Sequence, residues 1–305
     1  MKRYLKKLLC TIFAISILLV STIHVNAATP YRVISDDKAK TKVGNYYIWL
    51  NSEKGIYVSK SKKSSPKKIV KAPKSSDTYI THRLVTNGSK IYYGVVKDAK
   101  DGLSDYIKIY RIDVSGKNKV YVGKINHGES LSGYYNGNLF VEKDSYYRGG
   151  YDPTQADTYI YNLKSKKLSL VKREFKIDYQ NGKYILGSPY TGDVSPLPIH
   201  VYNASTKKIY KITSKGNNAK FLNGKVYYAY GDAYDSKPSN RKISIKTSSY
   251  TGSNQKTLCT IKMENGGAIL DIKSSYVKYV KYDKKFKENY YKYYYSSRKI
   301  VKVKQ

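Results

Sequence analysis

The chain has 305 residues, with 57 Lys and Arg against 22 Asp and Glu, so its formal net charge is +35. It contains two cysteines, which excludes a small module held together by several disulfides. Such a high positive charge implies polyanionic surroundings.

Residues 1–27 have the pattern of a cleaved secretory signal peptide. A basic start is followed by an apolar run, Leu8 to Val20, whose 13 residues are few for a membrane span. Val25-Asn26-Ala27 supplies small residues before the expected cleavage. We therefore expect a secreted mature chain of residues 28–305 without a transmembrane span; the alternative is an uncleaved N-terminal anchor.

The expected mature chain has 278 residues, enough for one large domain, and a net charge of +31. Its single cysteine, Cys259, alternates with Thr257 and Ile261, which predicts a buried strand residue. A secreted chain without an internal disulfide is typical of Gram-positive bacteria, where the abundant polyanions are wall teichoic acids and anionic lipids. No specific nucleic acid is expected.

An Asn-Gly pair between β-formers returns along the chain at Asn87, Asn136, Asn181 and Asn223, with spacings of 49, 45 and 42 residues. Both residues of such a pair accept the positive φ of a type I′ turn, so each pair predicts a hairpin. A period of about 45 residues with four strands per repeat is typical of propeller blades.

Six units of four strands, a to d, follow one another, with the Asn-Gly turn between strands a and b. Unit 1 has YRVIS, NYYIWL, GIYVSK and KKIVKA, and unit 2 has THRLV, SKIYYGVV, YIKIYRIDV and KVYVGKI. Units 3 to 5 repeat the pattern around the other three Asn-Gly pairs. Unit 6 has AILDI, YVKYVKY, YYKYYYSS and IVKVK, with Ser274-Ser275 in place of Asn-Gly, while Asn265-Gly266 falls between units 5 and 6.

These patterns predict an all-β fold: a six-bladed β-propeller of four-stranded antiparallel blades in residues 28–305. The 36 tyrosines fit blades that pack on both faces, because Tyr fills space while its hydroxyl reaches a polar partner. A β-sandwich would not need six comparable units. Choline- and glucan-binding repeats are shorter, about 20 residues, and depend on Trp, whereas this chain has only Trp49.

The segments IYYGVV and VYYAYGD, each after a turn, and the strand IYRIDV resemble the YWTD/TolB-like six-bladed propellers. The chain is most similar to uncharacterised secreted propeller domains of Gram-positive bacteria. The resemblance covers nearly all of 31–305 and implies the fold and export. It implies no catalytic residues.

The predicted turns between strands c and d are rich in basic residues. In antiparallel blades these turns share one end with the a–b turns, while the b–c and d–a loops lie at the other end. The b–c loops hold 13 of the 22 acidic residues, Glu142 among them, so we expect a cationic face that binds a polyanion such as teichoic acid. Solubility alone is the alternative. The residues expected to bind the polyanion are Lys60, Lys62, Lys63, Lys67, Lys68, Lys117, Lys119, Lys164, Lys166, Lys167, Lys207, Lys208, Arg298 and Lys299.

Three b–c loops combine Tyr with Asp and Arg, side chains that suit recognition of a glycan or a protein on a rigid scaffold. Solvated loops without a ligand are the alternative. The residues expected to bind are Tyr146, Tyr147, Arg148, Tyr151, Asp152, Tyr190, Asp193, Tyr230, Asp232, Tyr234 and Asp235.

An enzyme would need polar groups that converge on the central channel. The candidates on or before strand a are Asp77, His82, His127, Glu129, Asp178 and Asp271. They share no nucleophile, zinc or calcium motif, so no catalytic residue, metal or cofactor is assigned. The sequence thus predicts a secreted, non-catalytic, monomeric binding propeller at the cell wall; the alternative is a hydrolase or lyase with a channel site.

Overall fold

The computed structural model describes residues 32–35, 40–98, 104–144, 156–189 and 196–304. These residues form β-strands and one short 3-10 turn, η1 (Pro238–Asn240). No helix in these ranges is long and apolar enough to span a membrane. The expected signal peptide lies outside the described residues.

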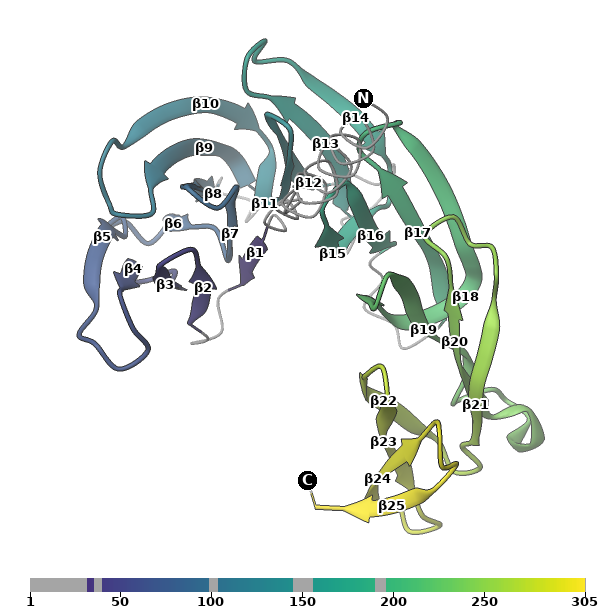
Figure 1. The fold of residues 1–305 in the computed structure, drawn as a ribbon. Coiled ribbons are helices and arrows are strands. Elements are labelled where there is room, and N and C mark those ends of the chain that lie inside the picture. Colours follow the sequence, from purple (N-terminus) through teal and green to yellow (C-terminus); the bar gives the residue numbers. More distant parts are fainter. Residues whose placement is uncertain (1–31, 36–39, 99–103, 145–155, 190–195, 305) are drawn as a thin grey trace, which may run out of the picture. The chain divides into compact units, whose positions relative to one another are not determined.

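The first complete sheet is a four-stranded antiparallel meander (Figure 1). Its strands are β2 (Thr41–Val43), β3 (Tyr46–Asn51), β4 (Gly55–Ser59) and β5 (Lys67–Lys71). Residues Gly44 and Asn45 close the β2–β3 hairpin, and Gly44 has a φ of +57°, which a residue without a side chain adopts easily.

The N-terminal strand β1 (Arg32–Ser35) corrects one prediction. YRVIS was expected to be strand a of unit 1, but β1 pairs with β7 of the next sheet, with Val33 opposite Val85. The two-residue connection at Gly44 makes β2 the local partner of β3. The place of strand a in the first sheet is therefore already taken.

The second sheet contains β1 and five further strands, ordered β1-β7-β8-β9-β10 with β6 also on β8. The bounds are β6 (Thr78–Ile80), β7 (Arg83–Thr86), β8 (Lys90–Asp98), β9 (Ser104–Asp113) and β10 (Val120–Asn126). The predicted strand a of unit 2, THRLV, corresponds to β7, and the short strand β6 precedes it. The two strands pair with successive parts of β8.

The third sheet and the last sheet are four-stranded antiparallel meanders. The third contains β11 (Gly128–Tyr135), β12 (Asn138–Asp144), β13 (Ala156–Asn162) and β14 (Leu168–Lys172). The last contains β22 (Gly267–Ile272), β23 (Tyr276–Tyr282), β24 (Glu288–Tyr294) and β25 (Ile300–Val303). The predicted fourth strand IVKVK is therefore in its expected place.

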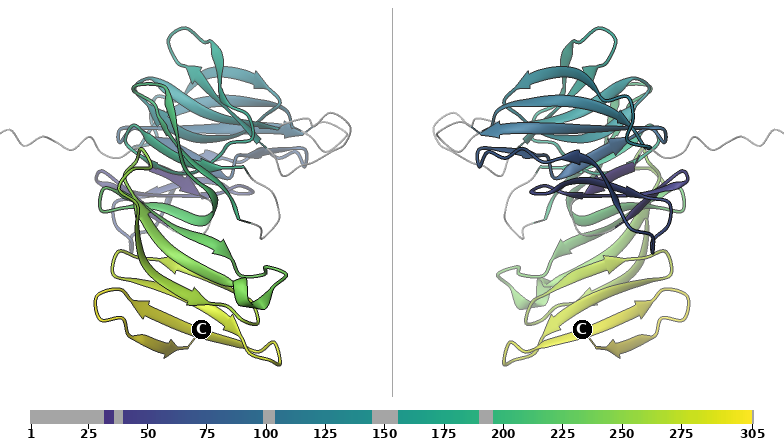
Figure 2. Two further views of the ribbon diagram at one scale, coloured as in Figure 1. Left: turned by 90° about the vertical axis from the view of Figure 1, so that its right-hand side faces the viewer. Right: turned by 90° about the vertical axis from the view of Figure 1, so that its left-hand side faces the viewer.

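Between them lies a seven-stranded sheet that two predicted units share. It contains β15 (Lys176–Asn181), β16 (Tyr184–Ser188), β17 (Leu197–Asn203), β18 (Lys208–Leu222), β19 (Lys225–Asp232), β20 (Lys242–Ser248) and β21 (Lys256–Lys262). The 15-residue β18 pairs with β17 up to Gly216 and with β19 from Gly216 onward. Each half thus corresponds to a four-stranded unit, and Figure 2 shows the continuous ribbon from two sides.

The predicted hairpin turns occur at all four Asn-Gly pairs, but two have a different geometry. Asn136 and Asn223 have positive φ together with the glycines that follow them, as a type I′ turn requires. At Asn87 and Asn181 only the glycine has positive φ. Asn87 instead uses its side-chain oxygen to accept hydrogen bonds from the amides of Ser89 and Lys90, which widens that turn.

The core consists of clusters shared by consecutive sheets, and paired tyrosines show how. Tyr92 and Tyr93 are neighbours on β8 and both are buried, Tyr93 in the cluster with the first sheet and Tyr92 in the cluster with the third. Tyr227 and Tyr228 on β19 repeat this arrangement. A strand with both faces buried needs bulk on both, which confirms the packing role predicted for Tyr. Cys259 is buried, as predicted.

Candidate functional site

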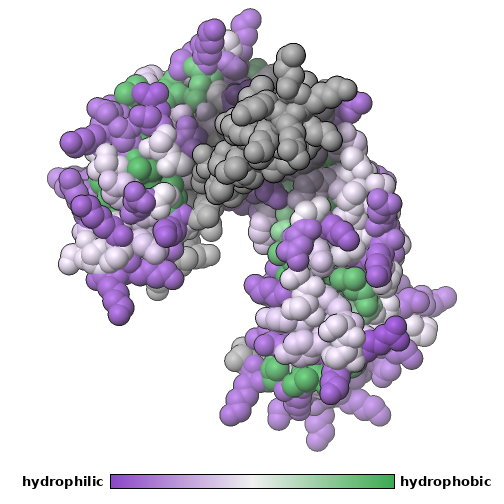
Figure 3. All heavy atoms as spheres, viewed as in Figure 1, coloured by the Kyte–Doolittle hydropathy of each residue, from purple (hydrophilic) through white to green (hydrophobic). Residues whose placement is uncertain are grey.

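The residues predicted to bind a polyanion lie in the turns between the third and fourth strands of the units or at the start of the fourth strand. They occupy the connections β4–β5, β9–β10, β13–β14, β17–β18 and β24–β25. All fourteen are exposed. The face shown in Figure 3 is largely hydrophilic, with small separate apolar patches. Eleven of the residues lie in the predicted turns, whereas Lys67, Lys68 and Lys208 lie at the start of the fourth strand. Whether the set binds a polyanion stays a prediction.

Three of these basic residues share an unusual backbone conformation. Lys166, Lys207 and Arg298 have φ values of 58°, 59° and 54°, in the left-handed region. This region costs an ordinary L-residue about 1 kcal/mol or more, while Gly and Asn adopt it more easily. The ammonium of Lys166 donates to the Val122 carbonyl at 3.0 Å, which offsets part of that cost. No hydrogen bond or ion pair is found for the Lys207 and Arg298 side chains in the described part of the chain.

The turns around these residues are closely similar. In two of them an Asn at the end of the third strand, Asn162 or Asn203, accepts hydrogen bonds from backbone amides two and three residues later. The amide of Lys166 then donates to Asn162 O, and that of Lys207 donates to Asn203 O. The Asn side chain therefore fixes the turn, and the following basic residue takes the left-handed position. The sequence shows the four-residue spacing between the Asn and the basic residue, but not the hydrogen bonds that set the backbone conformation.

Other lysines of the basic turns rest on aromatic rings. The ammonium of Lys119 lies 4.9 Å from the ring centre of Tyr110, and that of Lys68 lies 5.3 Å from that of Tyr57. A cation over an aromatic face is attracted by the ring quadrupole. Tyrosine rings therefore restrict the positions of some of the lysine side chains.

Only part of the predicted ligand-binding loop face can be placed. Tyr146, Tyr147, Arg148, Tyr151, Asp152, Tyr190 and Asp193 lie outside the described residues. Tyr230 lies under the Lys246 ammonium at 4.0 Å, and Tyr234 is exposed. The carboxylates of Asp232 and Asp235 accept backbone hydrogen bonds from Tyr234 and Lys237, at 2.7 and 2.9 Å. Both aspartates therefore stabilise their own loop.

A buried ion pair connects the second and third sheets to β15. Glu142 on β12 is 2% exposed, and its Oε1 lies 3.1 Å from Arg83 Nη1 on β7. Oε1 also accepts the Ile177 amide of β15 at 2.9 Å, and Oε2 accepts the Ser130 hydroxyl of β11 at 2.9 Å. Arg83 donates in turn to the Ile177 carbonyl at 3.2 Å. A buried carboxylate with three donors is well compensated, so this group fixes the inner strands.

Asp178 follows Ile177 on β15 and is the predicted channel residue with the most unusual environment. Its carboxyl is solvent-accessible and accepts the Ser188 hydroxyl at 3.1 Å. Protein atoms surround it closely enough that desolvation, with a contribution from the charge of Glu142, raises its pKa to about 6. Ser188 and the charges of Arg83 and Lys176 act in the opposite direction. A carboxyl with such a pKa can exchange a proton near neutral pH.

Asp271, another channel candidate, is ion-paired. It contacts the ammonium groups of Lys220 on β18 and of Lys273, the latter at 3.0 Å. Partial burial opposes its ionisation, but the two lysines outweigh it and lower the pKa of Asp271. The same carboxylate and Asp178 add to the desolvation that raises the pKa of Tyr179.

The remaining channel candidates are scattered. The Asp77 carboxylate is held by the hydroxyls of Ser75 and Thr78. His82 packs its ring against Tyr79, and His127 Nδ1 lies 3.3 Å from the Ser104 carbonyl. The side chain of Glu129 is outside the described part. Within the described ranges, no three His, Cys, Asp or Glu side chains come together in a way that could hold a metal ion.

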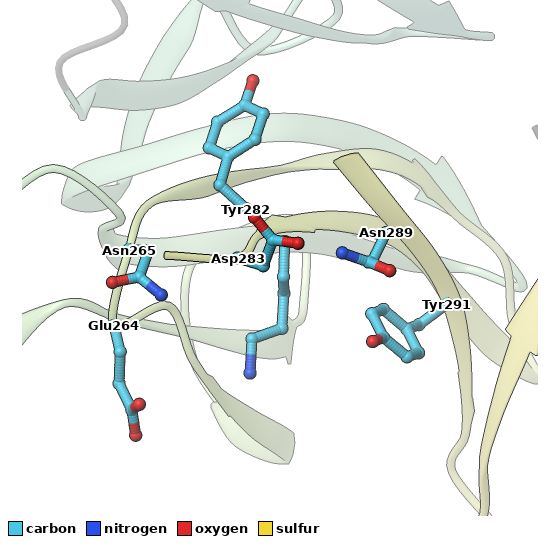
Figure 4. A pocket seen from close by; sticks show the side chains of 7 residues that line it. Glu264, Asn265, Tyr282, Asp283, Asn289 and Tyr291 are labelled. Carbon is cyan, nitrogen blue, oxygen red and sulfur yellow. The ribbon is translucent and has the colours of Figure 1, made fainter. Parts of the chain in front are cut away.

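A small hollow lies beside the last sheet, at the end that carries the β23–β24 loop (Figure 4). Its volume is about 180 Å³. The lining residues are Glu264, Asn265, Lys281, Tyr282, Asp283, Asn289 and Tyr291. Figure 4 shows Asn265 and Asn289 on opposite sides of the hollow, with the Tyr291 hydroxyl directed toward it. The Asn265-Gly266 pair between units 5 and 6 is the one feature of the sequence analysis that falls at this site.

No protein-family model and no curated protein matches the sequence. Among solved structures, the chain is similar to an oligogalacturonate lyase in complex with manganese, at 10% identity and a TM-score of 0.51, over 90% of this chain and 78% of the lyase. It is equally similar to an oligogalacturonate lyase from Vibrio parahaemolyticus, at 8% identity and a TM-score of 0.51, over 90% and 84%. These likenesses show a β-propeller fold.

TolB from Acinetobacter baumannii is a more distant neighbour, at 11% identity and a TM-score of 0.39, over 90% of this chain and 63% of TolB. The chain also matches a prolyl endopeptidase, at 12% identity and a TM-score of 0.44 over 90% of this chain, but it spans only 50% of that enzyme's length. The low identities carry no activity over to this chain.

Proposed function

We propose that this chain is a secreted, monomeric, six-bladed propeller that binds a polyanion of the cell wall, such as teichoic acid, through its basic turns. Signal cleavage after Ala27 would release residues 28–305 outside the cell. The Tyr- and Asp-bearing loops at the opposite end of the blades would recognise a glycan or a protein.

The grouping of the strands supports the proposal of six blades. Four-stranded units are formed by β2–β5, by β11–β14 and by β22–β25. A further unit is formed by β7–β10, with β6 beside β7 on the same edge of β8. The seven-stranded sheet supplies two more units through its shared strand β18. The added strand β1 belongs to the second unit.

The observation that carries the proposal is the basic residue in the left-handed position of similar turns. A surface designed only for solubility has no need of Lys207 or Arg298 at a backbone position that favours Gly or Asn. Their side chains are exposed and so are the other twelve residues of the set. Flexible, exposed ammonium groups bind polyphosphate mainly by releasing its condensed counterions. Such binding weakens steeply as salt increases.

The test is sedimentation of the purified chain with Gram-positive cell walls, with and without their teichoic acid, across a salt series. We expect binding that requires teichoic acid and falls steeply between about 50 and 200 mM salt. Binding that persists without teichoic acid, or that ignores salt, would contradict the polyanion proposal.

A second candidate function, an extracellular lyase or hydrolase, is favoured by Asp178. Its accessible carboxyl, with a pKa of about 6, lies next to the Arg83–Glu142 pair. An unprotonated Asp178 could act as a general base near neutral pH, and Arg83 could orient an anionic group. The test is incubation with oligogalacturonate and other acidic oligosaccharides, followed by mass spectrometry of the products. Turnover that disappears in Asp178→Asn would establish an enzyme, and intact substrates would remove this candidate.

A further inference from the structure

We propose that the hollow beside β23 and β24 is a binding site for one uncharged sugar residue. This proposal rests on the loop-face part of the proposed function. It does not depend on the basic turns, which lie at the other end of the same sheet.

The register of the last sheet brings the lining side chains together. Lys281 on β23 lies directly opposite Asn289 on β24, so both side chains emerge on one face. Tyr291 lies two residues beyond Asn289 on that face and stacks on Tyr279, with ring centres 5.5 Å apart. Glu264 and Asn265 reach the hollow from the connection that precedes β22.

The hydrogen-bonding groups are mixed, as a polyol requires. A sugar hydroxyl both donates and accepts, and the hollow offers amide, ammonium and phenol donors beside carboxylate and amide acceptors. Asn289 uses one N–H on the Lys287 carbonyl, at 3.2 Å, which leaves its other N–H and its oxygen for a ligand. One carboxylate oxygen of Asp283 accepts the Lys285 and Lys287 amides, so the loop fixes this group in advance.

Size and charge narrow the class of ligand. Pockets for drug-sized ligands have volumes of about 300–1,000 Å³, so a hollow of about 180 Å³ suits a single ring. The lining includes two carboxylates, Glu264 and Asp283, and one ammonium, Lys281. In the described part of the chain Lys281 makes no ion pair. The net negative charge disfavours an acidic sugar, while the half-buried Tyr291 provides apolar surface for an uncharged ring.

The neighbouring loop reinforces the site. Tyr234, one of the predicted ligand-binding residues, packs over Gly266 so closely that a Cβ there would lie 2.8 Å from its ring. Burial raises the pKa of Tyr234, and the interaction of its hydroxyl with that of Tyr282 raises it further. Gly266, with a φ of +87°, therefore allows the β19–β20 loop to support the wall of the hollow.

The experiment is saturation-transfer NMR on the full chain with glucose, galactose, N-acetylglucosamine and, as the acidic probe, glucuronate. The pocket variants are Lys281→Ala and Asn289→Ala. Lys278→Ala is the matched control, because Lys278 is a half-buried lysine on the same strand with its side chain on the opposite face.

We expect at least one neutral sugar to bind with a Kd on the order of 1 mM, and glucuronate to bind about tenfold more weakly. Each pocket variant should weaken the neutral sugar about tenfold, and Lys278→Ala should leave it unchanged. The proposal is overturned if no neutral sugar binds at about 10 mM, if glucuronate binds best, or if the pocket variants bind as well as the parent chain.

Sedimentation with cell walls, on the same samples, separates this proposal from the polyanion proposal. The pocket variants keep all fourteen residues of the basic turns, so their wall binding should match that of the parent chain. If the parent chain does not bind cell walls, the polyanion proposal is overturned, and the sugar result is unaffected.

Discussion

The Arg83–Glu142 pair and the basic turns differ in how their charges are compensated. Glu142 is buried and accepts hydrogen bonds from three partners on three other strands. Lys207 and Arg298 are exposed, lie at a costly backbone position and have no such partners in the described residues. The buried charge of Glu142 has its hydrogen-bond partners within the protein. The exposed charges of Lys207 and Arg298 are available to a binding partner.

The largest expected change in stability comes from removing the buried carboxylate of Glu142. Glu142→Ala leaves the Arg83 guanidinium and the Ile177 amide without their acceptor, so we expect the free energy of unfolding to fall by about 3 kcal/mol. Urea denaturation measures this change. Glu53→Ala, at an exposed glutamate, should alter stability by less than about 0.5 kcal/mol. Equal losses of stability at the two sites would contradict the stabilising role of the hydrogen bonds to Glu142.

The turn residues should respond in the opposite direction. Lys207→Asn and Arg298→Asn place a residue that tolerates the left-handed region at each turn, so each should raise the free energy of unfolding by about 1 kcal/mol. The same variants should bind cell walls more weakly, because each removes one cation. Thermal unfolding and sedimentation on one set of samples measure both effects. Variants that lose stability, or that keep full wall binding, would show that these residues serve the fold.

Asp178 is exposed, like the basic turn residues, but its pKa is shifted by its surroundings. Its contribution to the pH dependence of stability is the smallest of the expected effects. Its pKa in the folded chain, about 6, lies above its ordinary value of 3.8, so the folded state binds the proton more tightly than the unfolded state. The resulting stabilisation is present below pH 4 and is lost as the pH rises through about 6. Because the carboxyl is exposed, we expect no more than about 1 kcal/mol.

The comparison of Asp178→Asn with the parent chain by urea denaturation at pH 4 and pH 7.5 isolates this group. The variant should be more stable than the parent at pH 7.5 and nearly equal to it at pH 4. A variant that is less stable at pH 7.5 would mean that the ionised Asp178 is itself satisfied, as Glu142 is.

Local patterns made most of the architecture predictable. The Asn-Gly pairs and the alternation of strands located the units, and Ser274-Ser275 was correctly placed as the first turn of the last sheet. The pairing of β1 with β7 was missed. We expected β1 beside β3, but the two-residue turn at Gly44 makes β2 the partner of β3. Strand pairing over 50 residues leaves no periodic signal in the chain.

The basic turns could be located from the sequence because their lysines are contiguous. The left-handed position of Lys207 and Arg298 could not, since it depends on turn hydrogen bonds. The Glu142 cluster was also missed: Arg83, Glu142 and Ile177 are far apart in the chain and meet only through packing of inner strands. Glu142 was expected among the loop acids, and its burial follows from its place within β12.

The most direct test of the basic turns is a pair of matched charge reversals. One replaces Lys60, Lys62 and Lys63 in the β4–β5 turn by Glu, and the other replaces Lys284, Lys285 and Lys287 in the β23–β24 loop. Each set contains three exposed lysines, and the net charge changes equally. Binding to teichoic-acid-bearing walls at about 50 mM salt should fall at least tenfold for the first set and much less for the second. Equal loss from both sets would mean that net charge alone holds the protein to the wall, and the account of dedicated turns would be wrong.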